Sequence, residues 1–170
     1  MTVVVIGPPA AGKTSVGREL AARLGVRFVD TDDVIVSQHG PIPQIFASRG
    51  EPWFRRVERA AVARSLAAGG VVSLGGGAPL DAETAGLLAD HRVILLTVDV
   101  PSAAARIGGG GRPLVGDIDS WRDLVERRMP AYRALAKRTI DTSGRAVDEL
   151  ADELAQWVRG AAKAAEEAGA

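Results

Sequence analysis

A glycine-rich turn close to the start of the chain is the feature that most constrains its fold. It matches the phosphate-loop pattern G-x-x-x-x-G-K-[ST] in full, with the residues Gly7, Pro8, Pro9, Ala10, Ala11, Gly12, Lys13 and Thr14. An apolar run precedes the turn and a helical pattern follows it, which is the strand–turn–helix context that this motif requires. The alternative, a chance match of the whole pattern, is expected only roughly 0.004 times in a chain of this composition. The segment therefore predicts a site for nucleotide phosphates.

The parts of this loop have distinct predicted roles. The backbone N–H groups of the turn and of the first helical turn, which includes Ser15, are expected to surround the phosphates. The Lys13 ammonium is expected to reach the β and γ phosphates. The Thr14 hydroxyl is a suitable ligand for a magnesium ion, which prefers oxygen.

Length and composition indicate one compact domain. The chain has 170 residues, with 21 basic and 21 acidic side chains and no cysteine. The zero net charge and the lack of a like-charge block give no sign of a nucleic-acid or membrane partner. Without cysteine there are no disulfides or thiolate metal sites. The loop begins at Gly7, which leaves no room for a targeting segment ahead of it, and no apolar run approaches 18 residues, so we expect a soluble, cytoplasmic protein.

The alternation of strand and helix patterns predicts an α/β fold, with a parallel sheet of about five strands and helices on both faces. The expected strands are Val3–Ile6, Val26–Val29, Val71–Leu74, Val93–Val98 and a short edge strand at Thr139–Asp141. The helix after the phosphate loop is expected to end at Gly25. The domain is expected to cover residues 1–158, and the Ala-rich tail 159–170 is expected to fray.

Two segments interrupt the simple alternation. Residues 33–68 hold no convincing strand and indicate two or three short helices, of which residues from about 33 to 61 form a candidate insert for a second substrate. Gly108 to Asp119 begins with four glycines and is expected to be a mobile lid, because glycine loses the most backbone entropy on ordering. Ser120 is a possible cap for the next helix, which is expected to end at Pro130.

Two carboxylates follow the second expected strand. Asp30 and Asp32 come at its carboxyl end, on the same rim as the phosphate loop, where open α/β sheets bind their ligands. Asp30 is placed to hold magnesium through its water shell. Asp32 is placed to orient an acceptor hydroxyl, and to take its proton only as a weak base. The alternative is that such an Asp simply caps the helix that follows.

Four further motifs occur in a distinctive order: Asp30-Thr31-Asp32, Phe54-Arg55-x-x-Glu58, Gly75-Gly76-Gly77 and Arg112-Pro113. Together with the phosphate loop they make the chain resemble the shikimate kinases, from Val3 to about Val158. The resemblance implies a three-layer fold with a five-stranded sheet of order 2-3-1-4-5 and a mobile lid. It also implies ATP with Mg2+ as phosphoryl donor, shikimate as acceptor at its 3-hydroxyl, and a monomer.

The resemblance assigns roles on the acceptor side. Arg55 and Arg128 are implied to bind the shikimate carboxylate, for which the planar fork of arginine is suited. Without the resemblance, a solvated helix face would be the simpler interpretation of either arginine. Phe46 and Phe54 are implied to wall the acceptor ring, although an aromatic residue at helical spacing is more often plain core.

Backbone and lid residues complete the implied site. The Gly75–Gly77 backbone N–H groups are implied to approach the acceptor closely; the alternative is an ordinary strand-to-helix turn. Arg112 is implied to close over the transferring phosphoryl group. Arg106 is implied to stack on adenine, and Asp141 to Arg145 to form the far wall of the base site.

Ala10 and Ala11 depart from the family, whose loop is usually richer in glycine. A position with positive φ would resist alanine by roughly 1 to 2 kcal/mol.

Two other functions compete with that of a shikimate kinase. A gluconate-type kinase shares the loop and the sheet, but the triple glycine with Arg55 and Arg128 argues against it. A nucleotide-binding paralogue without turnover is supported by the two alanines alone.

Overall fold

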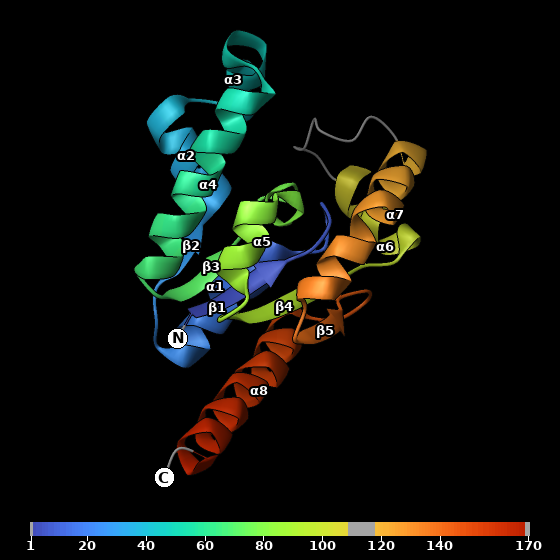
Figure 1. Cartoon of the computed structure of the whole chain (residues 1–170). Helices are drawn as coiled ribbons and strands as arrows, with labels where there is room; N and C mark the ends of the chain where they lie inside the picture. The colour runs from blue at the N-terminus through green and yellow to red at the C-terminus, as the bar shows by residue number, and fades with distance from the viewer. Residues whose placement is uncertain (1, 109–117, 169–170) are drawn as a thin grey trace.

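A five-stranded parallel sheet forms the centre of the molecule (Figure 1). The structure is a computed structural model that describes residues 2–108 and 118–168. The strands run in the order β2-β3-β1-β4-β5, which confirms the predicted order. Their bounds are β1 Thr2–Ile6, β2 Phe28–Asp30, β3 Gly70–Ser73, β4 Arg92–Thr97 and β5 Arg138–Asp141.

Both faces of this sheet are covered, which explains the continuous apolar runs in its central strands. Alternate strand residues point to opposite faces. One face packs on α1 (Lys13–Leu24) and α8 (Val147–Ala168), through side chains such as Leu20 and Leu154. The other face packs on α4 (Glu51–Ala67), α5 (Ala82–Leu88) and α7 (Ile118–Leu135), where Val62, Leu88 and Tyr132 are fully buried. The result is the predicted three-layer arrangement.

The segment between β2 and β3 forms three helices, as its breaks predicted. They are α2 (Thr31–His39), α3 (Ile42–Arg49) and α4, and α3 projects beyond the sheet in Figure 1. Their contacts form a small core of their own around Ile35, Ile45, Phe54 and Ala61. The third strand is followed by a short 3-10 helix, η1 (Ala78–Leu80), and α6 (Val100–Gly108) follows β4.

Strand β2 begins at Phe28, later than the expected Val26. The backbone N–H of Val26 donates to the carbonyl of Ala21 at 3.0 Å, so Val26 completes the end of α1. Gly25 is the left-handed C-cap of that helix, with φ 67°. This hydrogen bond removes Val26 from the sheet although its side chain favours strand.

Two helix boundaries also differ from expectation. Helix α7 begins at Ile118, so Ser120 lies inside it, and the helix continues through Pro130 to Leu135. Proline lacks the N–H that an interior position donates, but the buried Tyr132 beyond it packs against the sheet and holds the last turns in place. Helix α8 continues to Ala168 instead of ending near Val158, because alanine, lysine and glutamate are strong helix formers.

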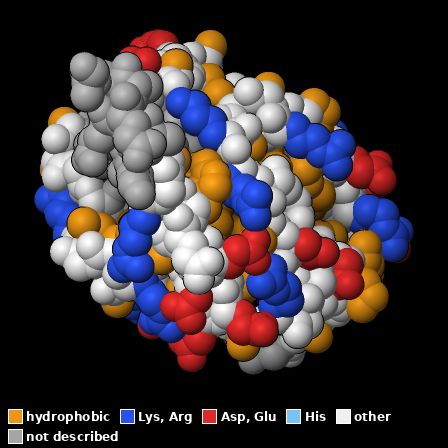
Figure 2. Space-filling view, turned by 90° about the horizontal axis from the view of Figure 1, so that it is seen from below, with side chains coloured by type: hydrophobic (Ala, Val, Ile, Leu, Met, Phe, Trp, Pro, Cys, Tyr) orange, Lys and Arg blue, Asp and Glu red, His pale blue; other side chains and the backbone are white. Residues whose placement is uncertain are grey.

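The surface is mixed in charge on the face that Figure 2 shows. Basic and acidic side chains lie interspersed there, which agrees with the equal numbers of the two in the sequence. Within residues 2–108 and 118–168, no helix combines the length and the apolar character needed to span a membrane. Most of the predicted lid, residues 109–117, lies outside the described part of the chain.

Candidate active site on the carboxyl rim of the sheet

The phosphate loop leaves β1 and leads directly into α1. A side chain at Gly7 would overlap the carbonyl oxygen of Leu96 on the neighbouring β4, and Gly7 has φ 146°, so only glycine fits there. Helix α1 begins at Lys13, so its N-terminus faces the loop. Ser15 lies exposed in this first turn. The local fold is the strand–turn–helix arrangement that the motif predicts.

The two alanines of the loop are not equivalent. Ala10 has φ 66°, the only positive φ of a non-glycine residue in the described chain. Such a conformation costs an L-residue about 1 to 2 kcal/mol. Ala11 is fully buried and packs in the core between α1 and the sheet. Alanine in place of glycine therefore leaves the backbone strained at Ala10, whereas the methyl group of Ala11 is part of the core.

Side chains from distant elements hold the outer side of the loop. The Lys13 ammonium donates to the carbonyl of Pro8 at 3.1 Å. The Arg106 guanidinium donates to the carbonyl of Ala10 at 2.8 Å, and to the hydroxyl and carbonyl oxygens of Thr142 at 2.9 and 2.8 Å. Arg106 thus lies beside the loop, as a nucleotide-binding role requires. Its stacking on adenine stays a prediction.

Oxygen atoms suited to a divalent cation meet next to the loop. The Thr14 hydroxyl donates to a carboxylate oxygen of Asp30 at 2.8 Å. Ser73 pairs with Asp30 in the β2–β3 register, and its buried hydroxyl has no hydrogen-bond partner in the described residues. These hard oxygen donors fit magnesium, which takes few protein ligands and keeps waters and phosphate oxygens.

Asp30 also caps the helix that follows it. Its second carboxylate oxygen accepts from the backbone N–H of Asp32 at 3.0 Å. The capping interpretation is therefore correct for Asp30, in addition to its contact with Thr14. Asp32 lies in the first turn of α2, and the cap directs its side chain toward the turn after β3.

Three consecutive glycines after β3 are each approached by one of the predicted acceptor residues. A Cβ atom built on Gly75 would lie 2.5 Å from a carboxylate oxygen of Asp32. On Gly76 it would lie 3.1 Å from Nη1 of Arg128, and on Gly77 it would lie 2.6 Å from Nη1 of Arg55. Real Cβ atoms do not approach other atoms at the shortest of these distances. Side chains at Gly75 or Gly77 would therefore displace the ends of Asp32 or Arg55 from the positions they take here.

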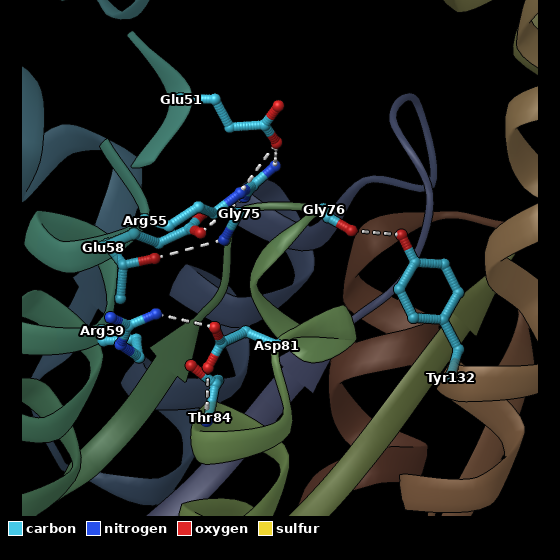
Figure 3. Close-up of polar contacts among 10 residues, drawn as sticks. Glu51, Arg55, Glu58, Arg59, Gly75, Gly76, Asp81, Thr84 and Tyr132 are labelled. Atoms are coloured by element: carbon cyan, nitrogen blue, oxygen red, sulfur yellow. Dashed lines mark hydrogen bonds and ion pairs between the residues drawn. The ribbon is translucent and has the colours of Figure 1, made fainter. Parts of the chain in front are cut away.

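Two glutamates on α4 hold Arg55 in place (Figure 3). Its Nη1 donates to Glu58 at 2.6 Å, and its Nε and Nη2 donate to Glu51 at 3.3 and 3.2 Å. Glu58 is 2% exposed, and this burial raises its pKa, while the ion pair with Arg55 opposes the rise. The neighbouring Arg56 is exposed. Arg55 therefore presents a fixed guanidinium to the site.

A second ion pair fastens α4 to the turn after β3. Arg59 donates to Asp81 at 2.8 Å, and the other carboxylate oxygen of Asp81 accepts from the backbone N–H of Thr84 at 2.9 Å, which caps α5 (Figure 3). The hydrogen bonds to Thr84 and Arg59 lower the pKa of Asp81. Arg55 and Arg59 lie on successive turns of α4. The ion pair between Arg59 and Asp81 therefore also keeps Arg55 close to Gly77.

Tyr132 was not predicted as a site residue, but the structure places it there. Its hydroxyl donates to the carbonyl of Gly76 at 2.6 Å, and burial raises its pKa (Figure 3). Tyr132 follows Arg128 by four residues on α7, so both lie on one face of the helix. This four-residue spacing from Arg128 was the sequence feature that could have predicted Tyr132 as a site residue. Trp121, which contacts the phosphate loop, gave no such signal, whereas Thr142 lies in the segment 141–145 that was expected to wall the base site.

The remaining predicted residues differ in their surroundings. Phe54 is 3% exposed and packs among the helices of the insert, which favours the core alternative for it. Phe46 is half-buried against it, with ring centroids 4.6 Å apart. Arg112 lies in residues 109–117, outside the described part of the chain.

The rim of the sheet thus carries the phosphate-loop motif and, beside it, two arginines and one carboxylate around the triple glycine, with Arg55 held by glutamates. This combination defines a P-loop kinase that acts on a small anionic acceptor. The family model described as shikimate kinase matches residues 9–159, and the chain belongs to the shikimate kinase family.

Several known proteins support this assignment. A shikimate kinase from Salinispora tropica is 48% identical over 157 residues, which is 89% of this chain and 94% of the relative. One from Saccharopolyspora erythraea is 45% identical over 161 residues, covering 91% and 92%. A solved shikimate kinase from Acinetobacter baumannii, in complex with shikimate, superposes with a TM-score of 0.84 at 34% identity and covers 94% of this chain and 93% of that one.

Replacing Ala10 with Gly is expected to stabilise the protein by about 0.5 to 1 kcal/mol. Relief of about 1 to 2 kcal/mol of left-handed strain exceeds the extra entropy of the unfolded chain, about 0.4 to 1 kcal/mol. Urea unfolding measures the change. The matched control is Ala11→Gly, which removes a buried methyl group without relieving strain and should destabilise by about 1 to 2 kcal/mol. Destabilisation by both substitutions would contradict the account of Ala10.

The buried Glu58 predicts a pH dependence of stability. Because its pKa is raised in the folded state, the folded protein binds this proton more tightly than the unfolded chain does. The stabilisation of the folded state that results from the raised pKa of Glu58 is then fully present below the ordinary pKa of a glutamate. It is lost as pH rises through the raised pKa. The unfolding free energy of the unsubstituted protein relative to Glu58→Gln should therefore fall on going from about pH 4 to pH 8. A difference that stays constant in urea unfolding across this range would contradict the assignment.

Proposed function

We propose that the chain transfers the γ-phosphoryl group of ATP to the 3-hydroxyl of shikimate, giving shikimate 3-phosphate and ADP. The observation that carries the proposal is the approach of Asp32, Arg55 and Arg128 to the triple glycine, on the rim that holds the phosphate loop. Phosphoryl transfer requires mainly that two substrates be positioned and that charge on the phosphoryl oxygens be offset. The two neighbouring sites meet the first requirement.

On the acceptor side, Arg55 and Arg128 bind the carboxylate of shikimate. A guanidinium binds a carboxylate through two parallel hydrogen bonds, and this requires that its plane be fixed in advance. The ion pairs of Arg55 with Glu58 and Glu51 supply that fixation. The backbone of Gly75–Gly77, free of side chains, forms the floor against which the acceptor lies, and Phe46, packed on the buried Phe54, supports its ring side.

Asp32 orients the acceptor hydroxyl. Its carboxylate lies against Gly75, at the corner of the acceptor site that is nearest in the chain to Asp30 and the cation ligands. A hydrogen bond accepted from the 3-hydroxyl would aim a lone pair of its oxygen at the γ phosphorus. Orientation, rather than strong base catalysis, is the role that an ordinary carboxylate can supply at neutral pH.

On the donor side, the loop amides and Lys13 bind the phosphates of ATP. Thr14 directly and Asp30 through water would hold a magnesium ion, which would offset charge on the β and γ phosphates. Ser73 is placed to accept or donate a hydrogen bond in the same water shell. Arg112 is proposed to stabilise the transferring group from the lid. A cytoplasmic location and a monomeric state stay predictions from the sequence.

A panel of acceptors tests the function directly. Purified, folded protein is incubated with ATP, magnesium and either shikimate or gluconate, and product is measured by mass spectrometry. We expect shikimate 3-phosphate and no phosphogluconate. Turnover of gluconate alone would support the gluconate-type alternative, and ADP binding without turnover of either acceptor would support the nucleotide-binding paralogue.

Arg55 and Arg56 form a matched pair for testing the acceptor site. Arg55→Ala removes charge-assisted hydrogen bonds worth about 1.5 to 3 kcal/mol, so the Kd for shikimate should rise about 10- to 150-fold while the Kd for ADP stays within about threefold. Arg56→Ala removes an exposed arginine one position away and should leave both values within about twofold. Calorimetric titration measures both ligands.

Arg55→Ala also leaves the buried Glu58 without its partner, so its fold is checked by circular dichroism and thermal unfolding. Equal weakening of shikimate and ADP binding in a folded variant would mean that Arg55 has a structural role only.

A further inference from the structure

Four consecutive carbonyl groups of the phosphate loop each accept a hydrogen bond from a side chain. The acceptor and donor pairs are Pro8 with Lys13 at 3.1 Å, Pro9 with Trp121 at 2.9 Å, Ala10 with Arg106 at 2.8 Å, and Ala11 with Thr142 at 3.1 Å. The last three donors come from α7, from α6 and from the turn after β5. The backbone of the loop is therefore held from outside by elements that are distant in sequence.

Holding a carbonyl group also sets the direction of the amide that follows it. In a planar trans peptide the C=O and the next N–H point in opposite directions. The carbonyl of Pro9 is held by the indole N–H of Trp121, and the N–H of the same peptide belongs to Ala10. Trp121 thus fixes the orientation of an amide in the middle of the phosphate-binding turn.

A flip of the Pro9–Ala10 peptide would relieve backbone strain. A flip of the Pro9–Ala10 peptide changes ψ of Pro9 and φ of Ala10 together, and it would take Ala10 from φ 66° toward the negative values that alanine prefers. The same flip would point the Ala10 N–H away from the phosphates. The strain at Ala10 therefore favours a form of the loop that binds nucleotide less well.

The hydrogen bond from Trp121 opposes this flip. Trp121 is 2% exposed, so its N–H has no ready replacement from water if the carbonyl of Pro9 turns away. An unpaired buried donor is costly. The bond from Arg106 to the carbonyl of Ala10 holds the next peptide in the same way. Ala10 is thus held on both sides in its strained conformation.

We propose that Trp121 is a positioning residue for the nucleotide: its indole N–H keeps the Pro9–Ala10 peptide in the orientation that binds phosphate. The inference rests on the nucleotide site of the proposed function. It does not depend on the identity of the acceptor, so its test uses ADP binding instead of turnover. Loss of acceptor phosphorylation and loss of this role can therefore be told apart.

Trp121→Phe tests the proposal, because it keeps an aromatic ring and removes the N–H. The Kd for magnesium-ADP, measured by calorimetry, should rise about three- to tenfold, as expected for one neutral hydrogen bond, while the Kd for shikimate stays within about twofold. Trp157→Phe is the matched control. Trp157 is half-buried on α8 and packs against the core, and its substitution should change neither Kd. An unchanged Kd for ADP in Trp121→Phe would overturn the proposal.

A double substitution separates positioning from simple packing. Glycine adopts positive φ without strain, so in the Ala10→Gly background the loop has less to gain from flipping. The loss of ADP affinity caused by Trp121→Phe should there shrink to about twofold or less. An equal loss in both backgrounds would overturn the proposal. If Trp121→Phe does not fold, a tryptophan analogue with sulfur in place of the N–H group is incorporated at this position. The Kd values for magnesium-ADP and shikimate then test the proposal in the same way.

Discussion

The absence of side chains at Gly75–Gly77 leaves the space into which the residues of the proposed acceptor site extend. Asp32, Arg55 and Arg128 come from α2, α4 and α7, and each approaches a different glycine so closely that a Cβ atom would collide with it or press against it. An open backbone at the carboxyl end of β3 is therefore the meeting point of three separate helices. The same rim carries the phosphate loop, since β3 lies beside β1 in the sheet.

Convergence alone would not give a usable site, because three ionisable side chains must also be held apart from one another. The buried pair of Arg55 with Glu58 and the pair of Arg59 with Asp81 hold α4 and its guanidinium against the turn. Helix α7 has a comparable role on the other side. It contacts the phosphate loop through Trp121 and the glycine turn through Tyr132. One helix thus spans the donor and acceptor sites, and its continuation through Pro130 is what brings Tyr132 to Gly76.

The sheet could be predicted because each central strand, buried on both faces, is a continuous apolar run, and the phosphate loop, the Asp30–Asp32 pair and the triple glycine each follow a strand. The missed features come from contacts between distant segments. Nothing near Trp121 indicates that it contacts Pro9, and the assignment of 141–145 to the base site did not include the contact of Thr142 with Ala11. The expected end of α7 at Pro130 overlooked the packing of Tyr132. The sequence predicted that a position with positive φ would resist alanine, and only the backbone angles show that Ala10 occupies such a position and Ala11 does not.

The central claim, that the triple glycine and its three neighbours form the acceptor site, is tested most directly by a crystal structure with magnesium-ADP and shikimate bound. The account predicts that the shikimate carboxylate accepts hydrogen bonds from Arg55 and Arg128. It also predicts that the acceptor ring lies over Gly75–Gly77 and that the 3-hydroxyl lies within hydrogen-bonding distance of Asp32. A shikimate molecule bound on this rim with its carboxylate away from both arginines, or with Asp32 nearest to a different hydroxyl, would contradict it.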